Sequence, residues 1–181
     1  IAWLRSDDPR FAPDSREYPP NQFNLFIKTL SNTLFSPPPF PEKPMAIPDS
    51  TNKIAFGKYV ADDLSNCYAC HSGDILKADF LVPEKSFGYY GGGTAMRNEA
   101  GETVTSANLT MDPETGIGNW TEQQFIEAVR FGKKPGGGSL SSPMMPHSML
   151  SDSEVSAIFA YLKTVPVIKN PVQRYQAAVA K

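Results

Sequence analysis

Apolar side chains recur every three or four residues in several stretches of this chain, which is the spacing of one helix face. No stretch shows the sustained alternation of apolar and polar residues that is typical of a half-buried strand. The pattern therefore predicts an all-α protein with long irregular loops. The helical stretches are residues 21–35, 51–66, 121–132 and 151–165.

The predicted helices carry signals at their ends. Thr121 and Ser151 are residue types favoured at helix caps, and Glu154 follows Ser151 at the spacing of a capping box. Gly132 and Pro166 are residues that typically end helices. These signals predict two well-defined helices in the second half of the chain.

Proline divides the chain. The stretch "SPPPFPEKP" lies within residues 36–50 and cannot form helix or central strand, so it is interpreted as an extended linker. This gives three segments: 1–50, a domain at 51–166, and a C-terminal extension at 167–181. The helix before the linker is expected to pack on a neighbouring domain, and binding to a membrane surface is the less favoured alternative.

Composition narrows the class of partner. The chain has 181 residues, 40% of them hydrophobic, and a formal net charge of -2. Residues 51–166 carry 9 basic and 13 acidic side chains, which argues against a nucleic-acid partner because phosphates are neutralised by clustered Lys and Arg. No run approaches the roughly 18 apolar residues of a membrane span, so membrane association is expected only through a segment outside this sequence.

The stretch "NCYACHS" holds the only two cysteines, Cys67 and Cys70, followed at once by His71. A disulfide would close a very small loop, a thioredoxin-like pair would be expected beside a strand–helix–strand unit, and a zinc site would need His147 as a fourth ligand. Covalent attachment of haem c, one per chain, also explains the adjacent histidine. Thiols three residues apart share a helix face and could bond the two vinyl groups, with the imidazole under the iron. The motif favours this interpretation among the four.

A second group of soft ligands lies in "SSPMMPHSML", which contains Met144, Met145 and Met149. Core packing is a poor explanation for three methionines in a polar, Pro-rich loop, although one of the three is expected in the core. A thioether at the other axial position would favour Fe(II). Met145 is the preferred distal ligand, with Met144 and His147 as rivals.

Together these segments resemble a class I cytochrome c domain, similar to the haem c modules of membrane-bound dehydrogenase cytochrome subunits and of diheme or multihaem cytochromes. The resemblance covers about residues 51–166. It rests on "GKYVADDLSNCYACHS", "SANLTMDPETGIGNWTEQQFIEAVRFG" and "PMMPHSMLSDSEVSAIFAYLKTVP". It implies a cytochrome c fold, with few helices around a covalently bound haem, after a Pro-rich N-terminal extension.

The resemblance also assigns roles to individual residues. Cys67 and Cys70 would hold the haem, His71 would be the proximal iron ligand and Met145 the distal one. His147 stands where the family usually has an aromatic residue.

Further positions follow from the same resemblance. Asn108, Trp120 and Arg97 are candidates to lie near the haem or its propionates, with ordinary loop packing as the alternative. The first and last helices of the domain should cross, with Gly57 admitting the ring of Tyr161.

Two glycine-rich stretches invite a phosphate-loop interpretation. Residues 80–102 and "KKPGGGSL" lack the spacing and the Gly-Lys-Ser/Thr ending of a P-loop. Both are therefore predicted to be flexible loops, the first covering the haem edge.

The opening "IAWLRS" matches "FAYLKT" of residues 159–164 in kind at all six positions. This suggests that residues 1–6 close a preceding cytochrome c domain, so that a second haem domain lies upstream in the same polypeptide. The alternative is an additional N-terminal helix of the one domain.

With both axial positions filled, the domain would pass single electrons and would not itself be an enzyme. We expect a relay between a respiratory or dehydrogenase donor and an acceptor, docked transiently near the haem edge, where Lys85, Lys133 and Lys134 are candidate rim residues. The alternative is a peroxidase-like haem enzyme with a dissociable distal ligand and His147 as base. By the family resemblance, the location is the periplasm or the outer face of the cytoplasmic membrane.

Overall fold

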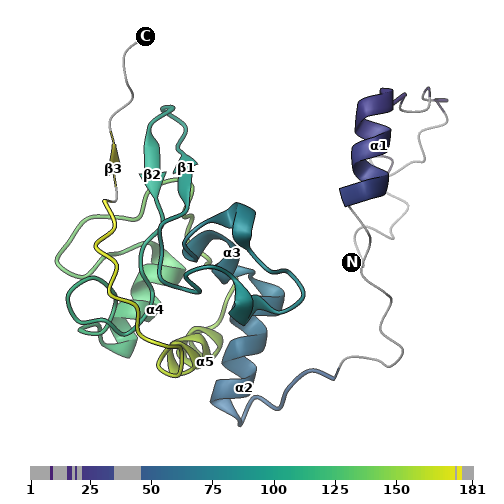
Figure 1. Cartoon of the computed structure of the whole chain (residues 1–181). Helices are drawn as coiled ribbons and strands as arrows, with labels where there is room; N and C mark the ends of the chain where they lie inside the picture. The colour runs from purple at the N-terminus through teal and green to yellow at the C-terminus, as the bar shows by residue number, and fades with distance from the viewer. Residues whose placement is uncertain are drawn as a thin grey trace. The chain divides into compact units, whose positions relative to one another are not determined.

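A computed structural model gives the fold of much of the chain, which divides into two compact units, residues 1–40 and 41–181 (Figure 1). The proposed repeat at residues 1–6 and most of the Pro-rich linker lie outside the described residues. The structure describes residues 9, 16, 17, 19, 22–34, 46–173 and 175–176.

The first unit contains α1 (Leu25–Leu34), as predicted for residues 21–35. The side-chain oxygen of Asn24 accepts a hydrogen bond from the backbone N–H of Ile27 at 2.8 Å, which caps the helix. Phe26 is exposed, so the described residues do not bury the apolar face of α1.

The second unit begins with three helical segments in succession. Helix α2 (Lys53–Lys58) is capped by Asn52, whose side chain accepts from the backbone N–H of Ala55 at 3.2 Å. It continues as a π-helical segment, η3 (Tyr59–Leu64), which turns Val60, Ala61 and Asp62 into the interior. Asn66 then adopts a left-handed conformation, with φ 51° and ψ 36°, immediately before α3 (Cys67–His71). The helix predicted for residues 51–66 is thus half α and half π.

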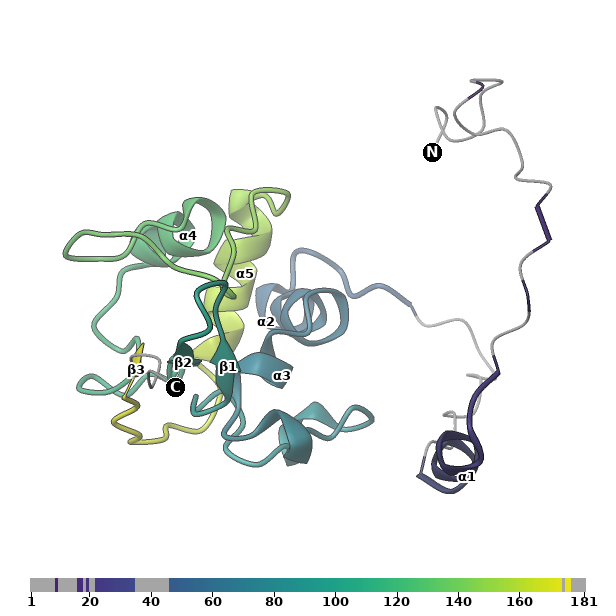
Figure 2. The same ribbon diagram turned by 90° about the horizontal axis from the view of Figure 1, so that it is seen from above.

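Helices α4 (Glu122–Phe131) and α5 (Asp152–Leu162) confirm the predicted caps. Both begin with a complete capping box, formed by Thr121 with Gln124 and by Ser151 with Glu154. Gly132 ends α4 in the left-handed region, at φ 71°. Seen from above, α5 lies between α4 and α2 (Figure 2). No helix among the described residues has the length and apolar character needed to cross a bilayer.

Helices α2 and α5 cross at Gly57, which confirms the predicted crossing but not its detail. A Cβ atom at Gly57 would overlap the backbone carbonyl of Ala157 and lie 3.0 Å from the nitrogen of Ile158. The prediction that Gly57 admits the ring of Tyr161 was wrong. The missing side chain makes room for helix backbone, which allows the two helix axes to approach closely.

The prediction that residues 80–102 form a flexible loop was also wrong. This segment contains a short 3-10 helix, η5 (Pro83–Lys85), and strand β1 (Ala95–Arg97). Tyr90 is completely buried and belongs to the main hydrophobic core. The segment is therefore part of the folded interior, because its aromatic residues supply core packing that the short helices lack.

A small antiparallel sheet of order β1-β2-β3 departs from an all-α fold. Met96 of β1 pairs with Val104 of β2 (Thr103–Thr105), which pairs in turn with Tyr175 of β3 (Tyr175–Gln176). Strands of two or three residues are too short to produce a visible period in the sequence. The unit remains helix-rich with few strands, which is compatible with a cytochrome c-like fold.

The segment after Pro166 packs on the same unit. The backbone N–H of Ile168 donates to the hydroxyl of Thr110 at 3.1 Å, and the side-chain amide of Asn170 donates to the carbonyl of Gly91 at 2.9 Å. These bonds lead the chain from α5 to β3.

Candidate functional site

The two cysteines occupy the single helical turn α3. Cys67 and Cys70 are three residues apart, so their side chains lie on one face of this turn. The two cysteines do not form a disulfide and each is partly exposed, whereas Tyr68 and Ala69 between them are buried. The turn is held against the core by its buried residues and presents both thiols together.

His71 ends α3 and is 9% exposed. Its Nδ1 lies 2.9 Å from the backbone oxygen of Ala107. Because a carbonyl oxygen only accepts hydrogen bonds, Nδ1 carries the proton, and Nε2 then carries the lone pair that can bind a metal. The contact fixes both the tautomer and the orientation of the imidazole.

Sequence reasoning did not find Ala107 or the backbone arrangement that brings it to His71. The N–H of Gly92 donates to the carbonyl of His71 at 2.7 Å, and Gly92 has φ 69°. A Cβ atom at Gly92 would overlap the backbone of Ala107 and Asn108. The available signal was the run of three glycines at residues 91–93, which indicated close backbone approach rather than mobility.

The environment of Cys67 makes its thiol a poor redox nucleophile. Burial of the thiol, followed by the charge of Asp62, raises the pKa of Cys67 to about 12. A reactive dithiol pair needs a lowered pKa, so the raised pKa of Cys67 gives no support to a thioredoxin-like function.

The methionine loop is tied to the end of α4. The backbone N–H of His147 donates to the carbonyl of Val129 at 2.7 Å, and Leu140 donates to the carbonyl of Gly132 at 2.6 Å. Met145 is 59% exposed, so its thioether is not occupied by core packing.

The expectation that one of the three methionines lies in the core was wrong. Met149 is 95% exposed and Met144 is only partly buried. The backbone is hydrogen-bonded at Leu140 and His147, while the methionine side chains of the loop lie outside the buried core.

His147 is the rival ligand in the same loop. It is partly buried, and its Nδ1 is a buried atom without a hydrogen-bond partner. Among the described residues, no group of three or more His, Cys, Asp or Glu side chains could hold a metal ion. His147 therefore does not complete a zinc site with the two cysteines.

The three remaining candidates lie in different surroundings. Asn108 is buried next to Ala107, and its amide donates to the carbonyl of Ile168 at 2.7 Å. Trp120 packs against the same hydrophobic core as Cys67. Arg97 is exposed on β1 and donates to the carbonyl of Gly101 within its own hairpin at 3.1 Å.

Comparison with known proteins places this arrangement in context. No protein-family model matches the chain. It is 38% identical over 111 residues to the cytochrome c subunit of alcohol dehydrogenase (quinone) from Gluconobacter oxydans (strain 621H), covering 60% of this chain and 20% of that protein. It is 30% identical over 115 residues to the fructose dehydrogenase cytochrome subunit of Gluconobacter japonicus, covering 61% and 21%.

A third relative, the gluconate 2-dehydrogenase cytochrome c subunit of Pantoea cypripedii, is 34% identical over 108 residues, covering 58% of this chain and 21% of that protein. The chain thus spans about a fifth of the length of these curated relatives. Its homologues are cytochrome c subunits of dehydrogenases, which confirms the resemblance drawn from the sequence and implies haem c.

Proposed function

We propose that residues 51–166 form a haem c domain that transfers single electrons, with His71 and Met145 as the axial iron ligands. One observation carries the proposal: the hydrogen bond from His71 Nδ1 to the carbonyl of Ala107, at 2.9 Å. It orients the histidine of a Cys-x-x-Cys-His turn in the manner of a metal-bound imidazole.

The residues present fit the group. Cys67 and Cys70 share one face of α3 and would hold the porphyrin through two thioethers. The Nε2 of His71 would bind the iron, and the exposed thioether of Met145 is a soft ligand suited to the opposite side. When bound, the haem supplies one-electron redox chemistry at its iron.

The chain's own residues then set the conditions for electron transfer. Ala107 keeps the proton on Nδ1. The backbone bonds of Leu140 to Gly132 and of His147 to Val129 hold the chain on either side of Met144 and Met145. Two filled axial positions would leave none for a substrate, so the domain would relay electrons and not catalyse a reaction.

The names of the relatives support a partner class. A domain homologous to dehydrogenase cytochrome subunits would receive electrons from a dehydrogenase or another respiratory donor and pass them to a redox acceptor. We place this relay in the periplasm or at the outer face of the cytoplasmic membrane. Residues 51–166 would carry one haem, and a second haem domain would lie upstream in the same polypeptide.

The absorption spectrum of the purified protein, oxidised and then reduced, tests the proposal. Low-spin haem c bands are expected in both states, with the weak far-red sulfur-to-iron band in the oxidised form. Met145→Ala should abolish the far-red band, whereas the matched variant Met144→Ala should retain it.

Other outcomes would change the assignment. A low-spin spectrum that lacks the far-red band, and that turns high-spin in His147→Ala, would make His147 the distal ligand. A high-spin spectrum of the unaltered protein would contradict a closed electron carrier and favour the peroxidase-like alternative.

A further inference from the structure

A buried carboxylate lies at the centre of a polar cluster beside α3, which we call the attachment turn because it carries Cys67 and Cys70. The side chain of Asp62, on the π-helical segment η3, has no exposure to solvent. Around it gather Tyr89 and Tyr90 from the segment before β1 and Tyr161 from α5, all three buried. We call Asp62 and these three tyrosines the Asp62 cluster.

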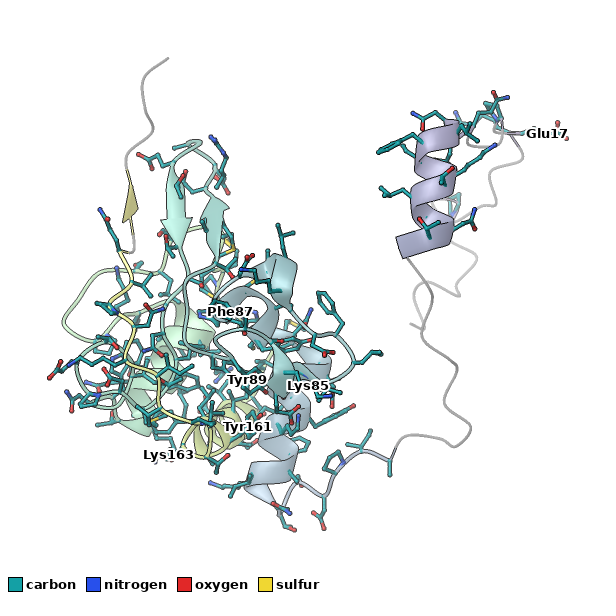
Figure 3. The ribbon with its side chains drawn as sticks, in the orientation of Figure 1. Glu17, Lys85, Phe87, Tyr89, Tyr161 and Lys163 are labelled. Carbon is teal, nitrogen blue, oxygen red and sulfur yellow. The ribbon has the colours of Figure 1, made fainter. Side chains whose placement is uncertain are left out.

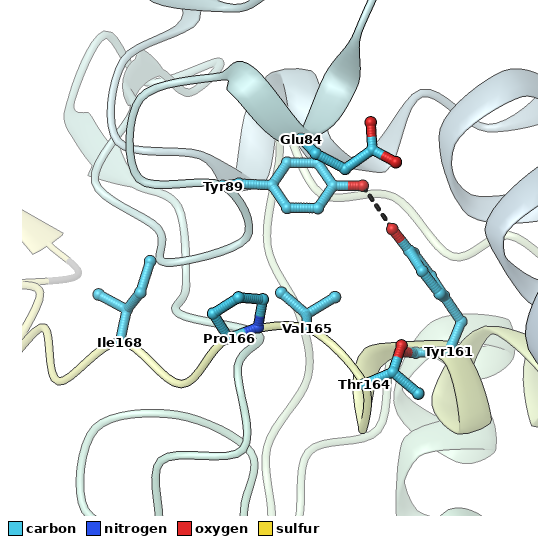
Figure 4. Close-up of a pocket in the computed structure, with 7 residues that line it drawn as sticks. All are labelled: Glu84, Tyr89, Tyr161, Thr164, Val165, Pro166 and Ile168. Atoms are coloured by element: carbon cyan, nitrogen blue, oxygen red, sulfur yellow. Dashed lines mark hydrogen bonds between the residues drawn. The ribbon is translucent and has the colours of Figure 1, made fainter.

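Hydrogen bonds converge on both oxygens of Asp62. Tyr90 donates to Oδ1 at 2.6 Å, and Tyr89 donates to Oδ2 at 2.6 Å. Tyr161 lies farther from Oδ2, at 3.3 Å, and pairs with the hydroxyl of Tyr89 at 2.7 Å. The side chains of Tyr89 and Tyr161 lie near each other in the second unit (Figure 3). Their hydroxyls point toward each other and are hydrogen-bonded (Figure 4).

The tyrosine protons stay on the tyrosines. Burial is the largest cause that holds the pKa of Tyr89 and Tyr90 far above the usual range. The hydrogen bond to Asp62 raises the pKa of Tyr89 further, and proximity to Cys67 and then to Asp62 raises that of Tyr90. Each phenol therefore acts as a neutral donor at physiological pH, and the carboxylate of Asp62 accepts the hydrogen bonds of Tyr89 and Tyr90.

One cation reaches the cluster from the surface. Lys58 Nζ lies 2.9 Å from Asp62 and 2.7 Å from Glu84, and the Lys58 side chain is 38% exposed. The charges of Lys58, Asp62 and Glu84 sum to one net negative charge. Water screens the outer two groups, whereas the carboxylate of Asp62 is shielded from water.

A pocket of about 280 Å³ opens beside the tyrosine pair, lined by residues that include Glu84 and Val165. The hydroxyls of Tyr89 and Tyr161 are hydrogen-bonded, and that of Thr164 donates to the carbonyl of Tyr161 at 2.7 Å. The pocket thus presents no unpaired hydroxyl to a ligand. The feature of this region that needs an explanation is the buried carboxylate of Asp62.

The cluster is in contact with the turn that carries the cysteines. The ring of Tyr68, between the two cysteines, lies 6.0 Å from the ring of Tyr89, centroid to centroid. Cys67 packs against the same hydrophobic core as Tyr89 and Tyr90. The charge of Asp62 also contributes to the raised pKa of Cys67, which is consistent with their proximity.

We propose that Asp62 lowers the reduction potential of the haem by holding a fixed negative charge beside the attachment turn. This inference rests on the proposed function. A nearby negative charge stabilises Fe(III) relative to Fe(II), and burial preserves the interaction because little water screens it. Well-packed apolar residues in place of a buried charge network often leave a protein at least as stable, so stability alone gives weak reason to retain the carboxylate of Asp62.

Asp62→Asn tests this directly, because it removes the charge while keeping the shape and one acceptor oxygen. We expect the Fe(III)/Fe(II) equilibrium to shift roughly tenfold toward Fe(II), which for a one-electron couple is a rise of about 59 mV in midpoint potential. Two unit charges on the order of 10 Å apart interact with an energy of this size when the effective dielectric is about 20. A loosened fold would expose the haem and lower the potential, so the sign separates the charge from a structural role.

The matched control is Asp63→Asn, which changes the formal charge equally one residue away. Asp63 is exposed, so its shift should be less than a third of that of Asp62→Asn. Lys58→Met should move the potential in the opposite direction, because it removes the cation that partly offsets Asp62. It also provides the test if Asp62→Asn does not accumulate as holoprotein.

The outcomes are distinct. A purified protein without covalent haem overturns the proposed function and this inference with it. With a normal low-spin spectrum, an unchanged or lowered potential in Asp62→Asn overturns this inference alone. So does an equal shift in Asp63→Asn, or an unchanged or raised potential in Lys58→Met.

Discussion

Replacing Gly57 by alanine tests the close crossing of α2 and α5. A Cβ atom at this position would overlap the carbonyl of Ala157 and lie 3.0 Å from the nitrogen of Ile158. Both obstacles are backbone atoms inside α5, so no side-chain rotation relieves them. Helices α2 and α5 would have to separate by on the order of 1 Å, which loosens the packing between them.

The size of the effect follows from two opposing contributions. Overpacking of this kind costs up to about 3 kcal/mol, whereas alanine is favoured over glycine within a helix by about 1 kcal/mol. The net destabilisation expected for Gly57→Ala is therefore about 2 kcal/mol. For a protein of this size, that lowers the thermal midpoint by roughly 4–8 °C.

Urea unfolding of the purified protein, followed by far-ultraviolet circular dichroism, measures the change. Ala55→Gly in the same helix is the control, with an expected cost of about 1 kcal/mol from helix propensity. If propensity alone governed Gly57, alanine would stabilise the protein. An unfolding midpoint for Gly57→Ala equal to or above that of the unaltered protein would refute the close crossing.

Three further predictions concern the buried network and the helix caps. Tyr89→Phe removes a hydroxyl that donates to Asp62 at 2.6 Å, and should lower the free energy of unfolding by about 1–3 kcal/mol. The control is Tyr59→Phe at a partly buried position, which should cost much less in the same urea assay. Burial raises the pKa of Tyr161 to about 12, above its unfolded value of about 10, so its stabilising contribution is full below pH 10 and lost as the pH rises toward 12. Urea midpoints should therefore agree at pH 7 and 9 and fall at pH 11, and an unchanged midpoint at pH 11 would count against this. Ser151→Ala removes the cap of α5 and should cost about 1 kcal/mol in thermal unfolding, and a loss no larger than that of Ser148→Ala would argue against the capping box.

Much of the candidate site is local in sequence and was predicted for that reason. Cys67, Cys70 and His71 fall within one turn, where the helix repeat alone decides which side chains share a face. The capping boxes of α4 and α5 also involve residues three apart. Interactions of this range depend on spacing, which the sequence displays directly.

The failures concern partners that are distant in the chain. Gly57 was expected to admit a tyrosine ring and instead faces the backbone of Ala157, one hundred positions later. A helical glycine indicates close approach, but the approaching group depends on how two helices cross. The small sheet was not predicted because its strands, of two or three residues, are too short to show a period.

The sequence by itself determined which side chains the turn Cys67–His71 presents together, because this requires only particular residue types at helical spacing. The tertiary structure decided its environment: Ala107 orients His71 from 36 residues away, and three tyrosines surround Asp62 from positions 27, 28 and 99 residues later. The physical reason is that hydrogen-bond partners and burial depend on which chain segments meet. That meeting is set by the packing of the whole domain, which no local pattern encodes.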